Sequence, residues 1–191
     1  AISGSITLNS YAVALSGSTA DVKAALAGTF GNTYTGNVTI TDASNTDINA
    51  TDITTIAGDT DGTVTVTNAI DLNGTAAQVT AAVAAVNTFS AAATANLSDN
   101  HTLAELKAIN NKLSGALTLN SYGVALGGSV ADIKAALAGS FASTYTGNVT
   151  FSDANAADIT ATDITTIAAA TDGTVTVTNT IDVNGTAAEV T

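Results

Sequence analysis

The chain has 191 residues, 46% of them hydrophobic, but only 4% are aromatic and much of the apolar fraction is Ala. Acidic residues outnumber basic ones 16 to 4, which gives a net charge of -12. No basic stripe exists to neutralise phosphates, so nucleic acid is excluded as a partner. Without Cys, disulfide and thiolate chemistry are excluded too. Polar residues interrupt every apolar stretch, so we expect no membrane insertion.

A long internal repeat organises the chain. The segment 3–11 returns as 114–122, a shift of 111 positions, and this shift holds without a gap from residue 2 to residue 80. Of the 79 paired positions, 58 are identical. The sequence therefore divides into a first long repeat, 1–111, and a second, shorter one, 112–191. Because the second copy stops inside a predicted helix, we expect further copies in the natural protein.

Each long repeat contains shorter units, which can be followed in chain order. An extended segment is expected at 11–15, a helix after Ser18, and a strand with alternating apolar residues and Thr at 36–42. The same order recurs with the strand 62–68 and the extended segment 69–72. Residues 87–98 are Ala-rich and irregular, and we interpret them as a variant unit and not as a hinge.

Seven helix starts are predicted from capping pairs, in which a Ser, Thr or Asn precedes an acid or amide by three residues. These pairs are Ser18 with Asp21, Asn49 with Asp52, Thr75 with Gln78, Thr102 with Glu105, Ser129 with Asp132, Thr160 with Asp163, and Thr186 with Glu189.

Successive starts are 26 to 31 residues apart, so the first long repeat holds four units and the second about three. This period predicts an α/β solenoid of strand-turn-helix coils of about 27 residues, with a parallel sheet on one side and short helices on the other. The alternative is two compact α+β repeat domains of about 110 residues each.

The segments 53–57, 61–67 and 73–79 resemble the Ala/Thr-rich tandem repeats of very large bacterial surface or secreted proteins, many of them cyanobacterial. The resemblance implies an extracellular or cell-surface location and a structural or adhesive role. Such proteins often carry Gly- and Asp-rich calcium nonapeptides. That motif does not occur in this sequence, so calcium binding of that kind does not carry over.

Candidate sites are few. The chain has one His, His101, and no Cys, so it cannot form a closed zinc site. We expect His101 to be solvated beside its helix cap, and we therefore expect no catalytic role for it. Calcium is the one cofactor to consider, because it prefers carboxylate oxygens. Its candidate ligands are Asp42, Asp47, Asp61, Asp71, Asp153, Asp158, Asp172 and Asp182. We favour caps and turns as the role of these acids.

Two functions fit these observations. The first is a structural rod, filament or surface-layer element that associates with further repeats or copies of itself. The second is an adhesin-type module that recognises a glycan, a surface or ice through a Thr-rich sheet face. The residues of that face would be Thr63, Thr65, Thr67, Thr174, Thr176 and Thr178. Thr is also simply a good strand residue on a solvated face, so the structural function is the one we favour.

Overall fold

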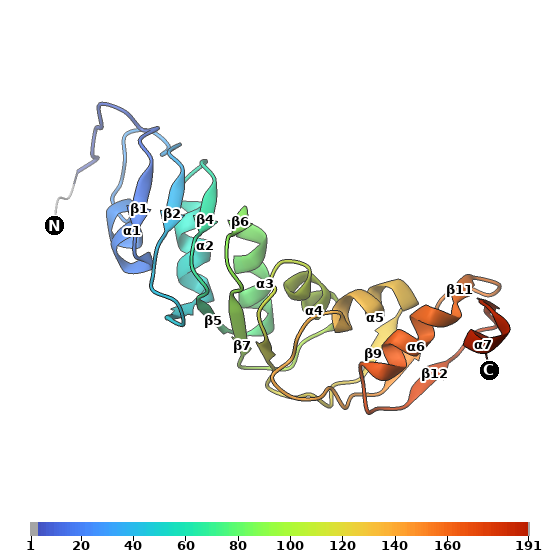
Figure 1. Cartoon of the computed structure of the whole chain (residues 1–191). Coiled ribbons are helices and arrows are strands. Elements are labelled where there is room, and N and C mark those ends of the chain that lie inside the picture. The colour runs from blue at the N-terminus through green and yellow to red at the C-terminus, as the bar shows by residue number, and fades with distance from the viewer. Residues whose placement is uncertain (1–3, 191) are drawn as a thin grey trace.

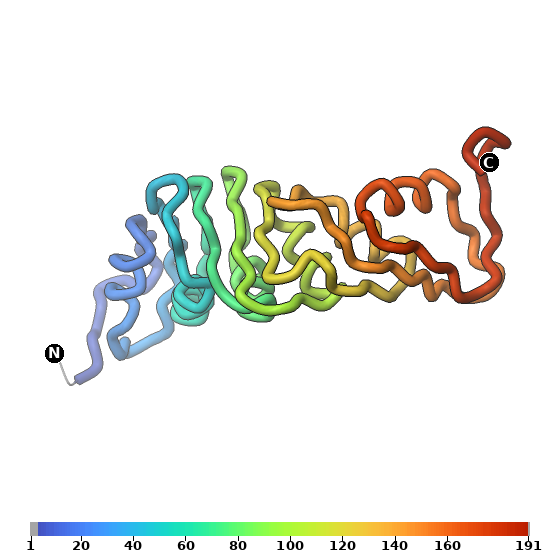
Figure 2. The backbone as a smooth tube through the Cα atoms, turned by 90° about the horizontal axis from the view of Figure 1, so that it is seen from below, coloured from blue at the N-terminus to red at the C-terminus, as the bar shows by residue number. Residues whose placement is uncertain are grey.

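The computed structural model describes residues 4–190, which form a mixed α/β protein with parallel strands in several small sheets. The predicted α/β class with parallel strands is confirmed. Figure 1 shows the elements following one another in chain order, with the two ends of the chain at opposite ends of the molecule. The backbone view in Figure 2, turned by 90°, shows the same elongated arrangement.

Seven helices lie within residues 4–190, and each packs against the next one along the chain. All are short, so packing on neighbours must supply most of their stability. Their bounds are α1 Thr19–Leu26, α2 Ala50–Gly58, α3 Ala76–Ala85, α4 Leu103–Asn110, α5 Val130–Leu137, α6 Ala161–Ala169 and α7 Ala187–Val190.

The strands pair in parallel with strands of the neighbouring units. Two four-stranded sheets have the orders β1-β2-β4-β6 and β3-β5-β7-β8, and two smaller sheets have the orders β12-β10-β9 and β11-β13. The first sheet comprises β1 Leu15–Gly17, β2 Val38–Ile40, β4 Val64–Val66 and β6 Thr88–Phe89. The second comprises β3 Asp47–Asn49, β5 Asp71–Gly74, β7 Thr94–Leu97 and β8 Leu117–Thr118. The smaller sheets comprise β9 Leu126–Gly128, β10 Val149–Phe151 and β12 Val175–Val177, and β11 Asp158–Thr160 with β13 Asp182–Asn184.

Strand periodicity explains the core. Val38 and Ile40 of β2 and Val64 and Val66 of β4 are buried, while the Thr between each pair is partly exposed. Ile53 of α2 is also fully buried. Apolar side chains from the strands and from the helices therefore form one continuous core, as the alternation of apolar residues with Thr predicts.

The irregular segment near the end of the first long repeat is ordered and paired. Residues 87–98 contain β6 and β7, and β7 pairs with β8 across the boundary between the repeats. The Gly115 N–H donates to the Ala93 carbonyl at 3.1 Å. One sequence expectation was misplaced: the extended segment expected at 11–15 forms a strand only from Leu15 onward, where pairing with Val38 begins.

Candidate functional site in the contacts between units

Five of the predicted caps bond to their helices as the pattern requires. The hydroxyls of Ser18, Ser129 and Thr160 accept from the backbone N–H three residues later. Thr75 with Gln78, and Thr102 with Glu105, form complete capping boxes in which each side chain bonds the other residue's backbone. These bonds satisfy backbone donors that a helix leaves free at its start.

The other two caps differ from the prediction. Asn49 occupies the cap position of α2, but its side chain makes no cap bond there. The first turn of α2 instead carries Asp52, whose carboxylate is paired with Lys23 of α1. At Thr186, the direction of the side-chain bond is reversed: its N–H and its hydroxyl both donate to the Glu189 carboxylate, at 2.7 and 2.8 Å.

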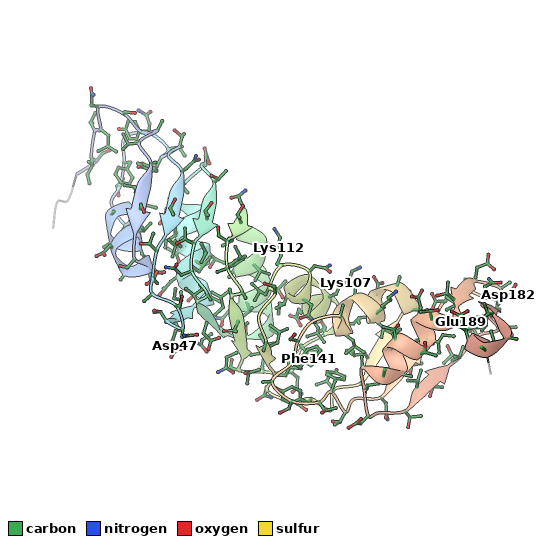
Figure 3. All side chains as sticks on the ribbon, in the orientation of Figure 1. Asp47, Lys107, Lys112, Phe141, Asp182 and Glu189 are labelled. Carbon is green, nitrogen blue, oxygen red and sulfur yellow. The ribbon has the colours of Figure 1, made fainter. Side chains whose placement is uncertain are left out.

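Lysine side chains connect successive helices. Lys23 pairs with Asp52, Lys107 with Asp132 and Lys134 with Asp163, in each case from one helix to the first turn of the next. Figure 3 labels Lys107, which belongs to α4. The Lys107 hydrogen bond, helped by Ser129, lowers the pKa of Asp132. The Lys134 and Thr160 hydrogen bonds lower the pKa of Asp163 in the same way. Both acids also complement the positive end of their own helix.

Three aspartates cap a helix that belongs to the preceding unit, an arrangement that we did not predict. Asp42 accepts from both the N–H and the hydroxyl of Thr19 at 2.7 Å. Asp153 accepts from the Val130 N–H at 2.9 Å, and Asp99 accepts from the Ala76 N–H at 2.7 Å. In each case the acid follows the first residue of the helix by 23 positions. This spacing was a signal available in the sequence.

The candidate calcium ligands are not gathered into a metal site. In the part of the chain that the structure describes, no three His, Asp or Glu side chains form a group that could hold a metal ion. Figure 3 shows Asp47 and Asp182 in distant parts of the molecule. The physical reason is that these acids are spread along the chain, two in each of four units, and bond to neighbouring units.

The remaining candidates make only pairwise contacts. Asp47 lies opposite Asp71, and Asp158 opposite Asp182, in the strand registers. One acid of each pair also accepts a hydrogen bond from an amide group. Asn73 donates to Asp47, and Asn184 donates to Asp158, both at 3.1 Å. The backbone N–H groups of Asp61 and Asp172 donate to the carbonyls of Tyr34 and Tyr145, both at 2.9 Å. We favoured caps and turns over calcium for these acids. Asp42 and Asp153 cap helices, whereas Asp47, Asp71, Asp158 and Asp182 lie in paired strands.

The predicted Thr face is only partly assembled. Thr65 stands in register with Thr39 on one side and Thr88 on the other, and Ser16 continues this row on β1. In the second repeat, Thr176 is opposite Thr150, but Gly127 ends the row.

The outer members of the predicted face have other roles. The hydroxyls of Thr67 and Thr178 donate to the carbonyls of Ile40 and Phe151 on neighbouring strands, at 3.0 and 2.7 Å. Thr63 and Thr174 are exposed, and their N–H groups are bound by the amide oxygens of Asn37 and Asn148. The face is therefore a single row of hydroxyls and not a regular two-dimensional array.

Glycines mark where one unit touches the backbone of the next. A Cβ at Gly62 would lie 2.3 Å from the Gly36 carbonyl oxygen, and one at Gly173 would lie 2.2 Å from the Gly147 oxygen. The buried hydroxyls of Thr60 and Thr171 donate to these same carbonyls, at 2.8 and 2.9 Å. The contact between turns of successive units therefore has no room for a side chain.

His101 was expected to be solvated, and this expectation was wrong. Its side chain is buried with 3% exposure, and Nε2 lies 3.0 Å from the Tyr145 hydroxyl in the second repeat. Burial lowers the pKa of His101, while the charges of Glu105 and Asp99 partly oppose this shift. Burial also raises the pKa of Tyr145. The sequence distance of 44 residues between His101 and Tyr145 hid this contact.

Comparison with protein-family models, with curated proteins and with solved structures found no match to this chain. Between residues 4 and 190, none of the helices is long and apolar enough to cross a membrane.

Proposed function

We propose that this chain is a segment of a structural solenoid, an elongated element of an extracellular bacterial protein, and not an enzyme. The observation that carries the proposal is that the units are joined in series. Helices pack on the next helix, strands pair with strands one unit away, and the pairing of β7 with β8 continues across the repeat boundary. This continuity favours one array over two compact domains joined by a linker.

The polar contacts support the same proposal. The Lys–Asp pairs, the aspartates that cap a helix of the preceding unit, and the glycine turns all connect one unit to its immediate neighbour. A protein held by nearest-neighbour contacts can be lengthened by adding units, and its stability grows with each added interface. Length and stiffness are the properties that such an array provides. The net charge of -12 would keep separate arrays apart except where specific surfaces meet.

The extracellular location rests on the Ala/Thr-rich repeat resemblance and on the composition. Further repeats of the same protein, or copies of the chain, would be the main partners.

Small-angle scattering of the purified chain tests the rod directly. A compact domain of this length would have a radius of gyration of about 16 Å. We expect a clearly larger value and a pair-distance distribution with the long tail of a rod, and thin particles by negative-stain electron microscopy. Compact monomers would contradict the proposal.

A second candidate function, binding to a glycan, a surface or ice, is favoured by one observation, the in-register row of Ser16, Thr39, Thr65 and Thr88. Glycan-array binding and inhibition of ice recrystallisation are the measurements. If the row binds, the double variant T39V/T65V should abolish the signal. The matched control is T33V/T144V, which changes two exposed Thr outside the row and should leave binding intact.

A further inference from the structure

The N-terminal face of the array is an open apolar cavity of about 330 Å³. The side chains of Leu8, Val13, Leu15, Ala25, Phe30 and Tyr34 line it. Val13 is 56% exposed, which is unusual for a large apolar side chain in this protein. Figure 1 shows β1 and α1, which contribute Leu15 and Ala25 to this lining, at the N-terminal end of the molecule.

The second long repeat carries the same face 111 positions later, and there it is covered. Leu126 and Ala136, the counterparts of the half-buried Leu15 and the exposed Ala25, are 2% and 0% exposed. Tyr34 is already buried at 5% exposure, and its counterpart Tyr145 is 1% exposed. The covering elements are α4, which packs against α5 and β9, and the segment that leads into α4. The second long repeat therefore shows which segment of the chain can cover this face.

Polar contacts hold the cover in place. His101 reaches the Tyr145 hydroxyl, Lys107 pairs with Asp132, and the Asn110 amide donates to the Ala136 carbonyl. At the N-terminal face, the counterpart of Asp132 is Asp21. Its carboxylate accepts from its own cap residue, Ser18, and none of the four Lys side chains, all of which are described, pairs with it.

Glycines give an independent indication of what is to be bound. A Cβ at Gly115 would lie 2.4 Å from the Ala93 carbonyl oxygen, and one at Gly128 would lie 2.5 Å from Leu103 Cδ2. At their counterparts the neighbours are missing. Among the described atoms, a Cβ at Gly4 meets nothing within 4 Å, and one at Gly17 meets only Asp21 and Val22 of its own unit.

We propose that the N-terminal face is a docking site for a segment with the sequence of residues 91–113, supplied by another repeat of the same kind. The side chain equivalent to Leu103 would fill the apolar cavity. The equivalents of His101 and Lys107 would bind Tyr34 and Asp21. The main chain equivalent to Ala93 would lie against Gly4. This inference rests on the proposed function, since it names the partner of one end of the rod.

The test compares two proteins, the 191-residue chain and the same chain with a second copy of residues 81–111 joined ahead of Ala1. The join reproduces the natural spacing between the two repeats. Amide hydrogen exchange in residues 8–34 should slow by about tenfold or more in the extended protein, because docking protects the terminal unit from local opening. The added segment should itself become protected.

Glycine substitutions make the test specific. G4A should leave the urea midpoint of the 191-residue chain unchanged but should lower that of the extended protein, as G115A should in both proteins. An extension carrying the His101→Ala and Leu103→Asp changes in the added copy should give neither protection nor sensitivity to G4A.

An added segment that exchanges as freely as an unfolded chain, or G4A effects that are equal in the two proteins, would overturn the inference. Scattering of the 191-residue chain alone separates this failure from that of the proposed function. If the chain is rod-like but its extension stays unfolded, the docking site is disproved and the proposed structural role still stands. If the chain is compact, the proposed structural role is disproved.

Discussion

The imidazole of His101 lies 3.0 Å from the hydroxyl of Tyr145, and this contact joins the first long repeat to the second. The Tyr145 hydroxyl donates its proton to the Val124 carbonyl at 2.6 Å. We therefore infer that Nε2 of His101 carries the proton and donates to Tyr145, which leaves Nδ1 as an acceptor. Nδ1 is buried without a partner among the described residues. Protonation there would place an unbonded N–H and a charge in the interior.

This geometry predicts that the protein loses stability as the pH falls below about 6.5, the ordinary His value. The folded state holds His101 at a lower pKa, so the unfolded chain takes up a proton first and acid favours unfolding. Between pH 7.5 and 5.5 the free energy of unfolding should fall by up to about 1 kcal/mol. Urea denaturation at the two pH values measures this change.

The control for this prediction is H101Q, which keeps an amide in place of the ring and does not titrate. Its pH dependence over the same interval should be flat. The interval stays above the range in which Asp132 and Asp163 would contribute, because lowered carboxylate pKa values destabilise the fold only at more acidic pH. An equal slope in H101Q and the unchanged protein would contradict the assignment.

A second prediction concerns the stacked turns. G62A should destabilise the protein by roughly 1–3 kcal/mol, because the new Cβ would collide with the Gly36 carbonyl and the turn would have to move. The matched control is G58A, at the end of α2, where a Cβ meets nothing and the second repeat already has Ala169. There we expect a gain of about 0.5–1 kcal/mol from helix propensity. Urea midpoints of both variants decide the matter.

A third prediction concerns capping between units. D42A removes the acceptor for two donors of Thr19 and should cost about 1–3 kcal/mol, because a charge-assisted bond is lost and a buried donor is left unsatisfied. D59A is the control, since Asp59 is exposed and the second repeat has Ala170 in its place. Its effect should lie within about 0.5 kcal/mol of zero. Calorimetry of both variants measures the difference, and similar losses would contradict the capping role.

Local chemistry was predictable from the sequence, whereas contacts between units were not. Capping pairs such as Thr75 with Gln78 are decided within four residues, so the helix starts could be placed. The role of Asp42 and the burial of His101 depend on which residue of another unit lies alongside, at separations of 23 and 44 residues. Short strands such as β6 and β8 were missed because two residues carry no period.

The last prediction uses a position at which the two repeats differ. Asn45 and its counterpart Ala156 both have positive φ, at 61° and 59°, and they are the only non-glycine residues of the described chain that do. The left-handed conformation costs a residue with a Cβ about 1 kcal/mol, and Asn tolerates it better because its side chain can bond the local backbone.

A156N should therefore stabilise the second repeat, and N45A should destabilise the first, each by up to about 1 kcal/mol. Both residues use their N–H in the same way, bonding to the carbonyls of Thr180 and Ala69, so the exchange leaves that contact unchanged. A154N changes an exposed Ala without positive φ two residues away, and it should have no such effect. Urea denaturation of the three variants measures the differences. Equal midpoints for A156N and A154N would show that backbone strain at this turn does not limit stability.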